Sequence, residues 1–110
     1  MDKTTIEKGK TLSFVAYLTL FGTLIAFLMN QEKRNEFTLF HIRQGLGLGL
    51  IYVLIAFVVS SLDSLMISMS FWIFFSILYI YGIIGAITGK CNKIPLLGDI
   101  FQNAFKTIGQ

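Results

Sequence analysis

The chain has 110 residues, of which 55% are hydrophobic, 14% are charged and one is proline, and its mean hydropathy is +0.73. A soluble fold of this size could not cover so much apolar surface, so the composition excludes an ordinary soluble domain and predicts a single all-α, membrane-integral unit. A net charge of +3 is too small to indicate a nucleic-acid partner, and one cysteine excludes an internal disulfide.

The first predicted element is an apolar segment at residues 11–29, between Lys10 and the charged stretch NQEKRNE. Its length is close to the ~20 residues that a helix needs to cross about 30 Å of hydrocarbon. No small-residue cleavage site follows it before Asn30, which argues against a cleavable signal. We therefore predict a transmembrane helix here.

Two further segments, at residues 45–62 and 65–88, also reach spanning length. Only Asp63 and Ser64 separate them, which is too short for anything but a tight helical hairpin. One of these two residues is expected to cap the third helix. The prediction is thus a bundle of three transmembrane helices.

The basic residues predict the orientation of such a bundle. In a three-span arrangement the first loop and the C-terminal tail share one side, and they carry Lys33, Arg34, Arg43, Lys90, Lys93 and Lys106, against Lys3, Lys8 and Lys10 on the other side. The positive-inside rule then places the first loop and the C-terminus in the cytoplasm and the N-terminus outside. A re-entrant first segment or a fourth crossing stays open as an alternative, and either would return the N-terminus to the inside.

The tail at residues 95–108 has a different pattern, because its apolar residues fall within an arc of about 140° at 100° per residue. Those residues are Leu97, Ile100, Phe101, Ala104, Phe105 and Ile108. Pro95 suits the start of a helix. We predict an amphipathic helix in the membrane interface, with a helix that covers the cytoplasmic ends of the bundle as the alternative.

The glycines of the stretch GLGLG lack the spacing of a nucleotide-binding loop and lead directly into an apolar segment. Pairs of small residues at a spacing of four instead recur in every predicted span. Such pairs let helix backbones approach closely in lipid. The predicted packing pairs are Gly22 and Ala26, Gly45 and Gly49, Gly82 and Ala86, and Gly85 and Gly89.

The polar residues before these glycines are the candidate functional residues. On a helix that begins near Thr38, His41 lies about 60° from the middle of the small-residue face and Arg43 about 140° away. His41 is therefore expected to face neighbouring helices, and Arg43 to face lipid headgroups or another protein. The predicted partner-contact residues are Phe40, His41, Arg43, Gln44, Pro95, Phe101 and Phe105.

The sequence contains no recognisable arrangement of catalytic residues. A proton relay through His41 would need an acidic partner at membrane depth, and Asp63 lies at the opposite end of the second predicted span. The histidine also has no serine or cysteine nucleophile nearby in the sequence. Cys91 lies beside Lys90 and Lys93, and three alternatives stay open for its thiol. It is acylated, it has a lowered pKa, or it is an ordinary free thiol. No catalytic residue, cofactor or metal site is predicted.

Four stretches of the sequence are similar to one known family: YLTLFGTLIAFLMN, FHIRQGLGL, GIIGAITGK and IPLLGDIF. Together they resemble small bacterial membrane proteins related to the twenty-kilodalton import component of the chloroplast inner-envelope translocon, the Tic complex. The resemblance extends from about Leu12 to Phe105, and it implies a role in protein translocation. The plant members have four spans, whereas the pattern here predicts three.

These observations predict a non-enzymatic, multi-pass protein of a bacterial inner membrane. Its leading predicted role is an accessory subunit of a protein-export or insertion assembly, because small-residue faces suit packing against partner helices. Its predicted partners are the lipid bilayer and other integral membrane proteins. Two alternatives are a self-associating channel or transporter, in which the chain forms a homo-oligomer, and a lipid-interacting envelope factor.

Overall fold

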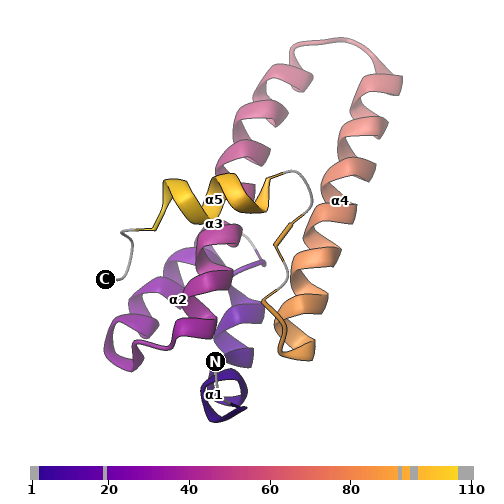
Figure 1. The fold of residues 1–110 in the computed structure, drawn as a ribbon. Coiled ribbons are helices and arrows are strands. Elements are labelled where there is room, and N and C mark those ends of the chain that lie inside the picture. Colours follow the sequence, from indigo (N-terminus) through magenta and orange to yellow (C-terminus); the bar gives the residue numbers. More distant parts are fainter. Residues whose placement is uncertain (1–2, 19, 92, 95–96, 107–110) are drawn as a thin grey trace.

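A computed structural model describes residues 3–18, 20–91, 93–94 and 97–106. These residues form only helices and connections, which confirms the all-α prediction (Figure 1). The helices are α1 (Lys3–Val15), α2 (Leu20–Lys33), α3 (Glu36–Ser60), α4 (Leu65–Thr88) and α5 (Gly98–Ala104).

The two long helices, α3 and α4, form an antiparallel hairpin that extends beyond the rest of the molecule (Figure 1). The predicted cap is present at its turn, where the Ser64 side chain accepts a hydrogen bond from the Ile67 N–H. At its other end α3 begins at Glu36, close to the helix start expected near Thr38 and nine residues before the predicted span at residues 45–62. The reason is Asn35, whose side chain accepts the Thr38 N–H as an N-cap.

The predicted transmembrane helix at residues 11–29 is wrong, because α1 ends at Val15 and α2 begins at Leu20. The chain turns back at this point, and the hydroxyl of Thr23 donates to the carbonyl of Ala16 at 2.7 Å. That bond satisfies one of the carbonyls that a helix end leaves without an intrahelical partner. The segment is therefore two short helices that fold against each other. Within the described residues, only α3 and α4 are long and apolar enough to cross a membrane.

The pair of α1 and α2 lies along the first half of α3. Thr38 of α3 donates to the carbonyl of Gly9 in α1, and Leu20 at the start of α2 packs on Gly49. The turn between α1 and α2 thus reaches only about halfway along α3. The remaining half of the hairpin projects alone from the bundle, in a molecule of 48 × 22 × 21 Å (Figure 1).

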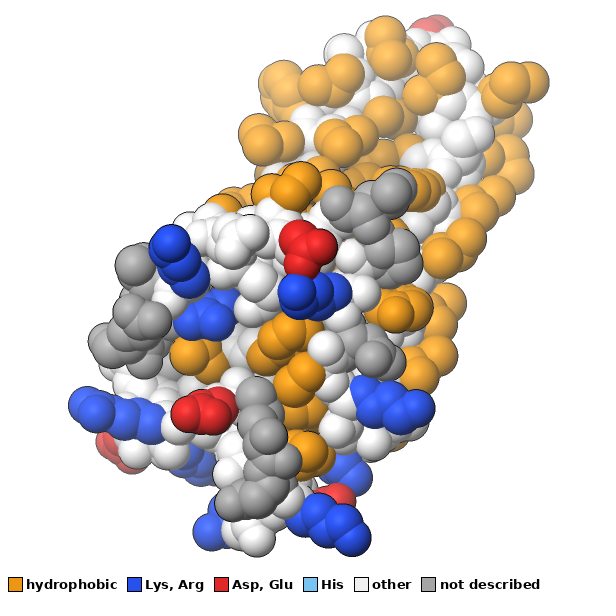
Figure 2. All heavy atoms as spheres, in the orientation of Figure 1, with side chains coloured by type: hydrophobic (Ala, Val, Ile, Leu, Met, Phe, Trp, Pro, Cys, Tyr) orange, Lys and Arg blue, Asp and Glu red, His pale blue; other side chains and the backbone are white. Residues whose placement is uncertain are grey.

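The projecting half of the hairpin is apolar on its surface. Phe57 is 79% exposed and Met66 is 80% exposed, and only 33% of the most apolar window of each long helix is buried inside the protein. Figure 2 shows hydrophobic side chains over this part, whereas charged side chains gather over the other half. Helices of a soluble core would be mostly buried, so α3 and α4 are compatible with a membrane environment.

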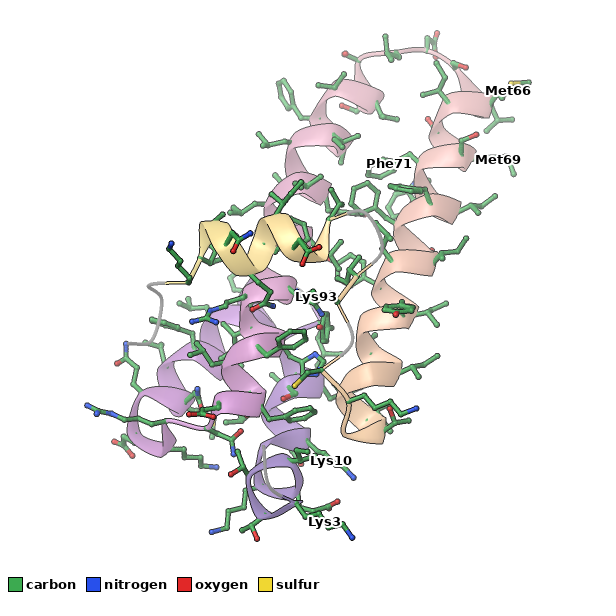
Figure 3. All side chains as sticks on the ribbon, viewed as in Figure 1. Lys3, Lys10, Met66, Met69, Phe71 and Lys93 are labelled. Carbon is green, nitrogen blue, oxygen red and sulfur yellow. The ribbon has the colours of Figure 1, made fainter. Side chains whose placement is uncertain are left out.

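All nine basic residues lie in the half of the molecule that contains α1, α2 and α5. They are Lys3, Lys8, Lys10, Lys33, Arg34, Arg43, Lys90, Lys93 and Lys106. In Figure 3 the labelled Lys3, Lys10 and Lys93 lie far from Met66, which is close to the hairpin turn. Because α1 and α2 fold back, the N-terminal lysines are not separated from the other basic residues, as three spans would require.

The C-terminal helix α5 is shorter than the predicted 95–108 and packs across α3 (Figure 1). The ring of Phe101 lies against Gly47, where a side chain would collide with it. Ile100, by contrast, is 58% exposed. The predicted apolar face is therefore divided between a contact with α3 and the outer surface. Pro95 lies outside the described residues.

Candidate functional site

Three polar side chains meet inside the bundle, where α1, α3 and the end of α4 come together. His41 and Gln44 of α3 are both 0% exposed, and Tyr17, in the turn after α1, is 2% exposed. His41 is therefore internal, as its predicted helical angle requires. Tyr17 joins it because the turn after α1 directs the tyrosine ring onto Gly82 of α4.

Hydrogen bonds link these three side chains to the segment that follows α4. The Tyr17 hydroxyl is 2.6 Å from His41 Nδ1 and 2.7 Å from Gln44 Nε2. His41 Nε2 lies 3.0 Å from the carbonyl of Lys90, and Gln44 Oε1 accepts the Ile94 N–H at 2.7 Å. We call Tyr17, His41 and Gln44, with these two backbone groups, the buried network.

The bonding partners determine the direction of each bond. The Lys90 carbonyl can only accept, so His41 Nε2 carries a hydrogen. In the neutral ring Nδ1 is then the acceptor, and the Tyr17 hydroxyl donates to it. The same hydroxyl oxygen accepts a hydrogen from Gln44 Nε2. Both nitrogens of the imidazole are thus used within the protein.

Aromatic rings surround His41 on three sides. The rings of Phe37, Phe40 and Tyr17 lie edge-on to the imidazole, with centroids 4.7, 5.1 and 5.4 Å away. This enclosure separates the histidine from water. The imidazole forms a hydrogen-bonded connection between α3, the turn after α1 and the segment after α4. Among the described residues, no group of three or more His, Cys, Asp or Glu side chains could hold a metal ion.

Arg43 lies on the other side of α3, and its guanidinium binds within the chain. Its Nε donates to the carbonyl of Phe105 at 3.1 Å, and Nη2 donates to the carbonyl of Lys106 at 2.8 Å. A cation is favourable there because the carbonyls at a helix C-terminus carry partial negative charge. The Gln102 amide adds a bond to the carbonyl of Phe40 at 2.9 Å. Together these contacts hold α5 on α3.

The small residues occupy several kinds of position. Gly22, Ala26, Gly45, Gly49, Gly82, Gly85 and Ala86 are buried. Gly45 faces the backbone of Ala16, whereas Gly49 and Gly82 face the side chains of Leu20 and Tyr17. Gly89 instead ends α4 in the left-handed conformation, with φ of 79°. This reversal needs glycine and brings the Lys90 carbonyl toward His41.

Two positions that the sequence pattern did not single out prove important. Tyr17 sits within an apolar run, and nothing local distinguishes its hydroxyl as part of a network. Asn35 caps α3 and also donates to the Thr5 carbonyl of α1 at 2.8 Å, while its own N–H bonds to the Asn30 side chain at 3.0 Å. The segment NEFT at 35–38, an N-cap residue followed by an acidic first turn, is the signal that could have located this helix start.

Cys91 lies beside the buried network, in the link after α4. The residue as a whole is exposed, but partial burial of its thiol raises its pKa above the ordinary value. The pKa of Cys91 is therefore raised, whereas the neighbouring Lys90 and Lys93 alone would lower it.

The raised pKa predicts slow alkylation of Cys91. Less thiolate is present at any given pH, so the rate of reaction with iodoacetamide should reach its half-maximum at a higher pH than for an ordinary exposed thiol. The control is Lys93→Cys in a Cys91→Ser background, since the Lys93 side chain is 55% exposed. Rate profiles that coincide, or a Cys91 profile displaced to lower pH, would contradict the expected direction.

The described residues define a class: a small all-α protein with two helices of membrane-spanning length and an internal polar network. Comparisons with known proteins do not extend this description, because no protein-family model, curated protein or solved structure matches the chain. The resemblance to the Tic-related family stays a prediction.

Proposed function

We propose that the protein is a non-enzymatic subunit of a bacterial inner-membrane assembly, accessory to protein translocation, with α3 and α4 as its two membrane-crossing helices. One observation carries the proposal. The hairpin exposes apolar side chains over its projecting half, while the polar side chains of the stretch FHIRQ bond within the chain. Such a molecule offers surface for packing against lipid and partner helices rather than groups for chemistry.

The proposed orientation follows from the charges. The nine basic residues lie in one half of the molecule, and Asp63 is the single charged residue at the hairpin turn. By the positive-inside rule, both ends of the described chain face the cytoplasm and the hairpin turn faces the other side. In this arrangement α1 and α2 form a re-entrant hairpin that enters the membrane from the cytoplasmic side and returns.

The lengths of the two helices agree with a crossing. α3 has 25 residues and α4 has 24, which at 1.5 Å per residue is about 36 to 38 Å. Both exceed the ~30 Å of hydrocarbon and permit some tilt. By contrast, α1 has 13 residues and α2 has 14, and neither could cross alone.

Labelling of single cysteines in a Cys91→Ser background tests this orientation. In spheroplasts, a membrane-impermeant maleimide should label a cysteine at Asp63 and should leave cysteines at Lys8 and Lys93 unlabelled until the membrane is permeabilised. Position 8 separates two arrangements, because a three-span protein would expose it outside. Labelling of position 8 in intact spheroplasts would overturn the re-entrant arrangement.

The proposed role is tested by photo-crosslinking in cells and by purification in mild detergent with mass spectrometry. A crosslinkable residue in place of Phe57, which is 79% exposed, should capture a translocation subunit. The same residue in place of Phe101, which is 3% exposed, should capture only its own chain. A probe at Arg43 tests the separate prediction that this residue contacts a partner.

Other outcomes of the crosslinking and purification would indicate the alternative functions. Capture of only a second copy of the chain by the probe at position 57 would favour the self-associating channel or transporter. Capture of lipid alone, with no protein recovered after purification, would favour the envelope factor. Either result would overturn the accessory role in translocation without bearing on the crossing helices.

A further inference from the structure

A cleft of about 620 Å³ opens between α3 and α4 on the side where α1 and α2 pack. The turn between α1 and α2 closes one end of it, through residues such as Tyr17 and Leu20. Aromatic side chains line its walls, among them Tyr52 of α3 and Trp72 and Tyr79 of α4. Its volume falls within the range of about 300–1,000 Å³ that is usual for small-molecule sites.

The position of the closed end limits what can occupy the cleft. Leu20 packs on Gly49 of α3, and α3 continues from Gly49 to Ser60 at the hairpin turn. Those eleven residues correspond to about 16 Å of helix, which is close to half of the ~30 Å hydrocarbon thickness. With the polar hairpin turn at one membrane surface, the closed end therefore lies near the middle of the bilayer.

We propose that this cleft binds one acyl chain of a phospholipid from the leaflet on the side of the hairpin turn. The lining begins at Val53 and Trp72, each seven residues or about 10 Å of helix from the hairpin-turn ends of α3 and α4. The methyl-terminal part of an acyl chain of that leaflet reaches this depth. A partner helix, or a helix of a second copy, would cross the whole bilayer and would collide with the turn between α1 and α2. The proposal rests on the proposed insertion of α3 and α4 and names a ligand for that membrane-embedded face.

The fluorescence of Trp72 can report binding in the cleft, because Trp72 lines the cleft and is the single tryptophan of the chain. Bromine atoms placed along an acyl chain quench tryptophan fluorescence on contact. We would titrate the purified protein, in detergent micelles, with phosphatidylglycerol brominated in one acyl chain. Quenching of Trp72 should saturate near an equimolar ratio of lipid to protein, followed by a shallow linear phase from lipid in the micelle.

Two neighbouring substitutions on α4 separate the cleft from the general lipid surface. Ser76→Phe fills the cleft, since Ser76 is part of its lining, and should abolish the saturable phase. Ile77→Phe changes a side chain that is 59% exposed and lies outside the lining, and should preserve that phase. Circular dichroism and thermal melting establish that each variant is folded. If Ser76→Phe fails to fold, Val53→Phe fills the cleft from the α3 wall.

The proposal is overturned by purely linear quenching of the wild-type protein, or by a saturable phase that survives in a folded variant with the cleft filled. Capture of a protein instead of lipid by a crosslinkable residue at position 76 in cells would overturn it as well. Failure of the proposed membrane insertion has a different signature, because the protein would then be released from membranes by alkaline carbonate extraction.

Discussion

Replacing Tyr17 with phenylalanine should destabilise the protein more than any other loss of a single atom in the bundle. The hydroxyl is the donor for His41 Nδ1 and the acceptor for Gln44 Nε2, and both of these side chains are 0% exposed. Loss of a buried hydrogen bond costs roughly 1–3 kcal/mol, and this substitution removes one bond from each of two buried side chains. The measurement is the free energy of unfolding in detergent, from denaturant titration followed by circular dichroism.

Tyr81→Phe is the matched control, since Tyr81 of α4 is 38% exposed and its loss should change stability by no more than about 0.5 kcal/mol. A double-mutant cycle of Tyr17→Phe with His41→Leu adds a second criterion. Residues in one hydrogen-bonded network couple, so the double variant should lose less stability than the two single variants combined. Equal effects of Tyr17→Phe and Tyr81→Phe would show that the buried network contributes little.

The second large effect is expected for Gly45→Ala. A methyl group at this position would meet the backbone carbonyl of Ala16, at the end of α1. Backbone cannot rotate away as a side chain can, so the substitution should cost the ~1–3 kcal/mol that is typical of overpacking. It should also displace the turn that carries Tyr17. The same unfolding measurement in detergent determines the size of the loss.

Gly49→Ala provides the comparison, because the added methyl group would there meet the side chain of Leu20. A flexible side chain can adopt another rotamer, so the loss of stability should be smaller than for Gly45→Ala. Val58→Leu, at a position that is 56% exposed, should be neutral. The sequence pattern treats Gly45 and Gly49 as an equivalent pair, so equal losses for these two glycines would favour the pattern over the observed contacts.

How far the sequence predicts the fold differs between segments. For α4 and the hairpin turn, the apolar length and the Ser64 cap were sufficient, because both features depend on neighbouring residues alone. For α3 the apolar length located the span at residues 45–62 but not the start of the helix at Glu36, which the Asn35 cap determines. For residues 11–29 the same length criterion failed. Neither proline nor glycine marks the turn after Val15, and its stability comes from Thr23 and from the close approach of Gly45 on another helix.

The candidate site shows the same division. The helical angle correctly placed His41 inside, since rotation along one helix is a local property. Its hydrogen-bond partners could not be predicted, because Tyr17 and Lys90 are 24 and 49 residues away in the chain. Likewise, the angle of Arg43 indicated an outward side chain, but α5 packs over that face and accepts its hydrogen bonds.

The sequence by itself determined the all-α class, the two long apolar helices with their capped turn, and the inward direction of His41. These follow from composition and from periodicity within single helices, which the local chain encodes. Only the tertiary structure decided that residues 11–29 turn back, that the nine basic residues share one half of the molecule, and that Tyr17 completes the buried network. The physical reason is that these features depend on contacts between different helices, which periodicity within one helix does not encode: Thr23 of α2 bonds to the Ala16 carbonyl at the end of α1, and Gly45 of α3 lets that backbone approach closely.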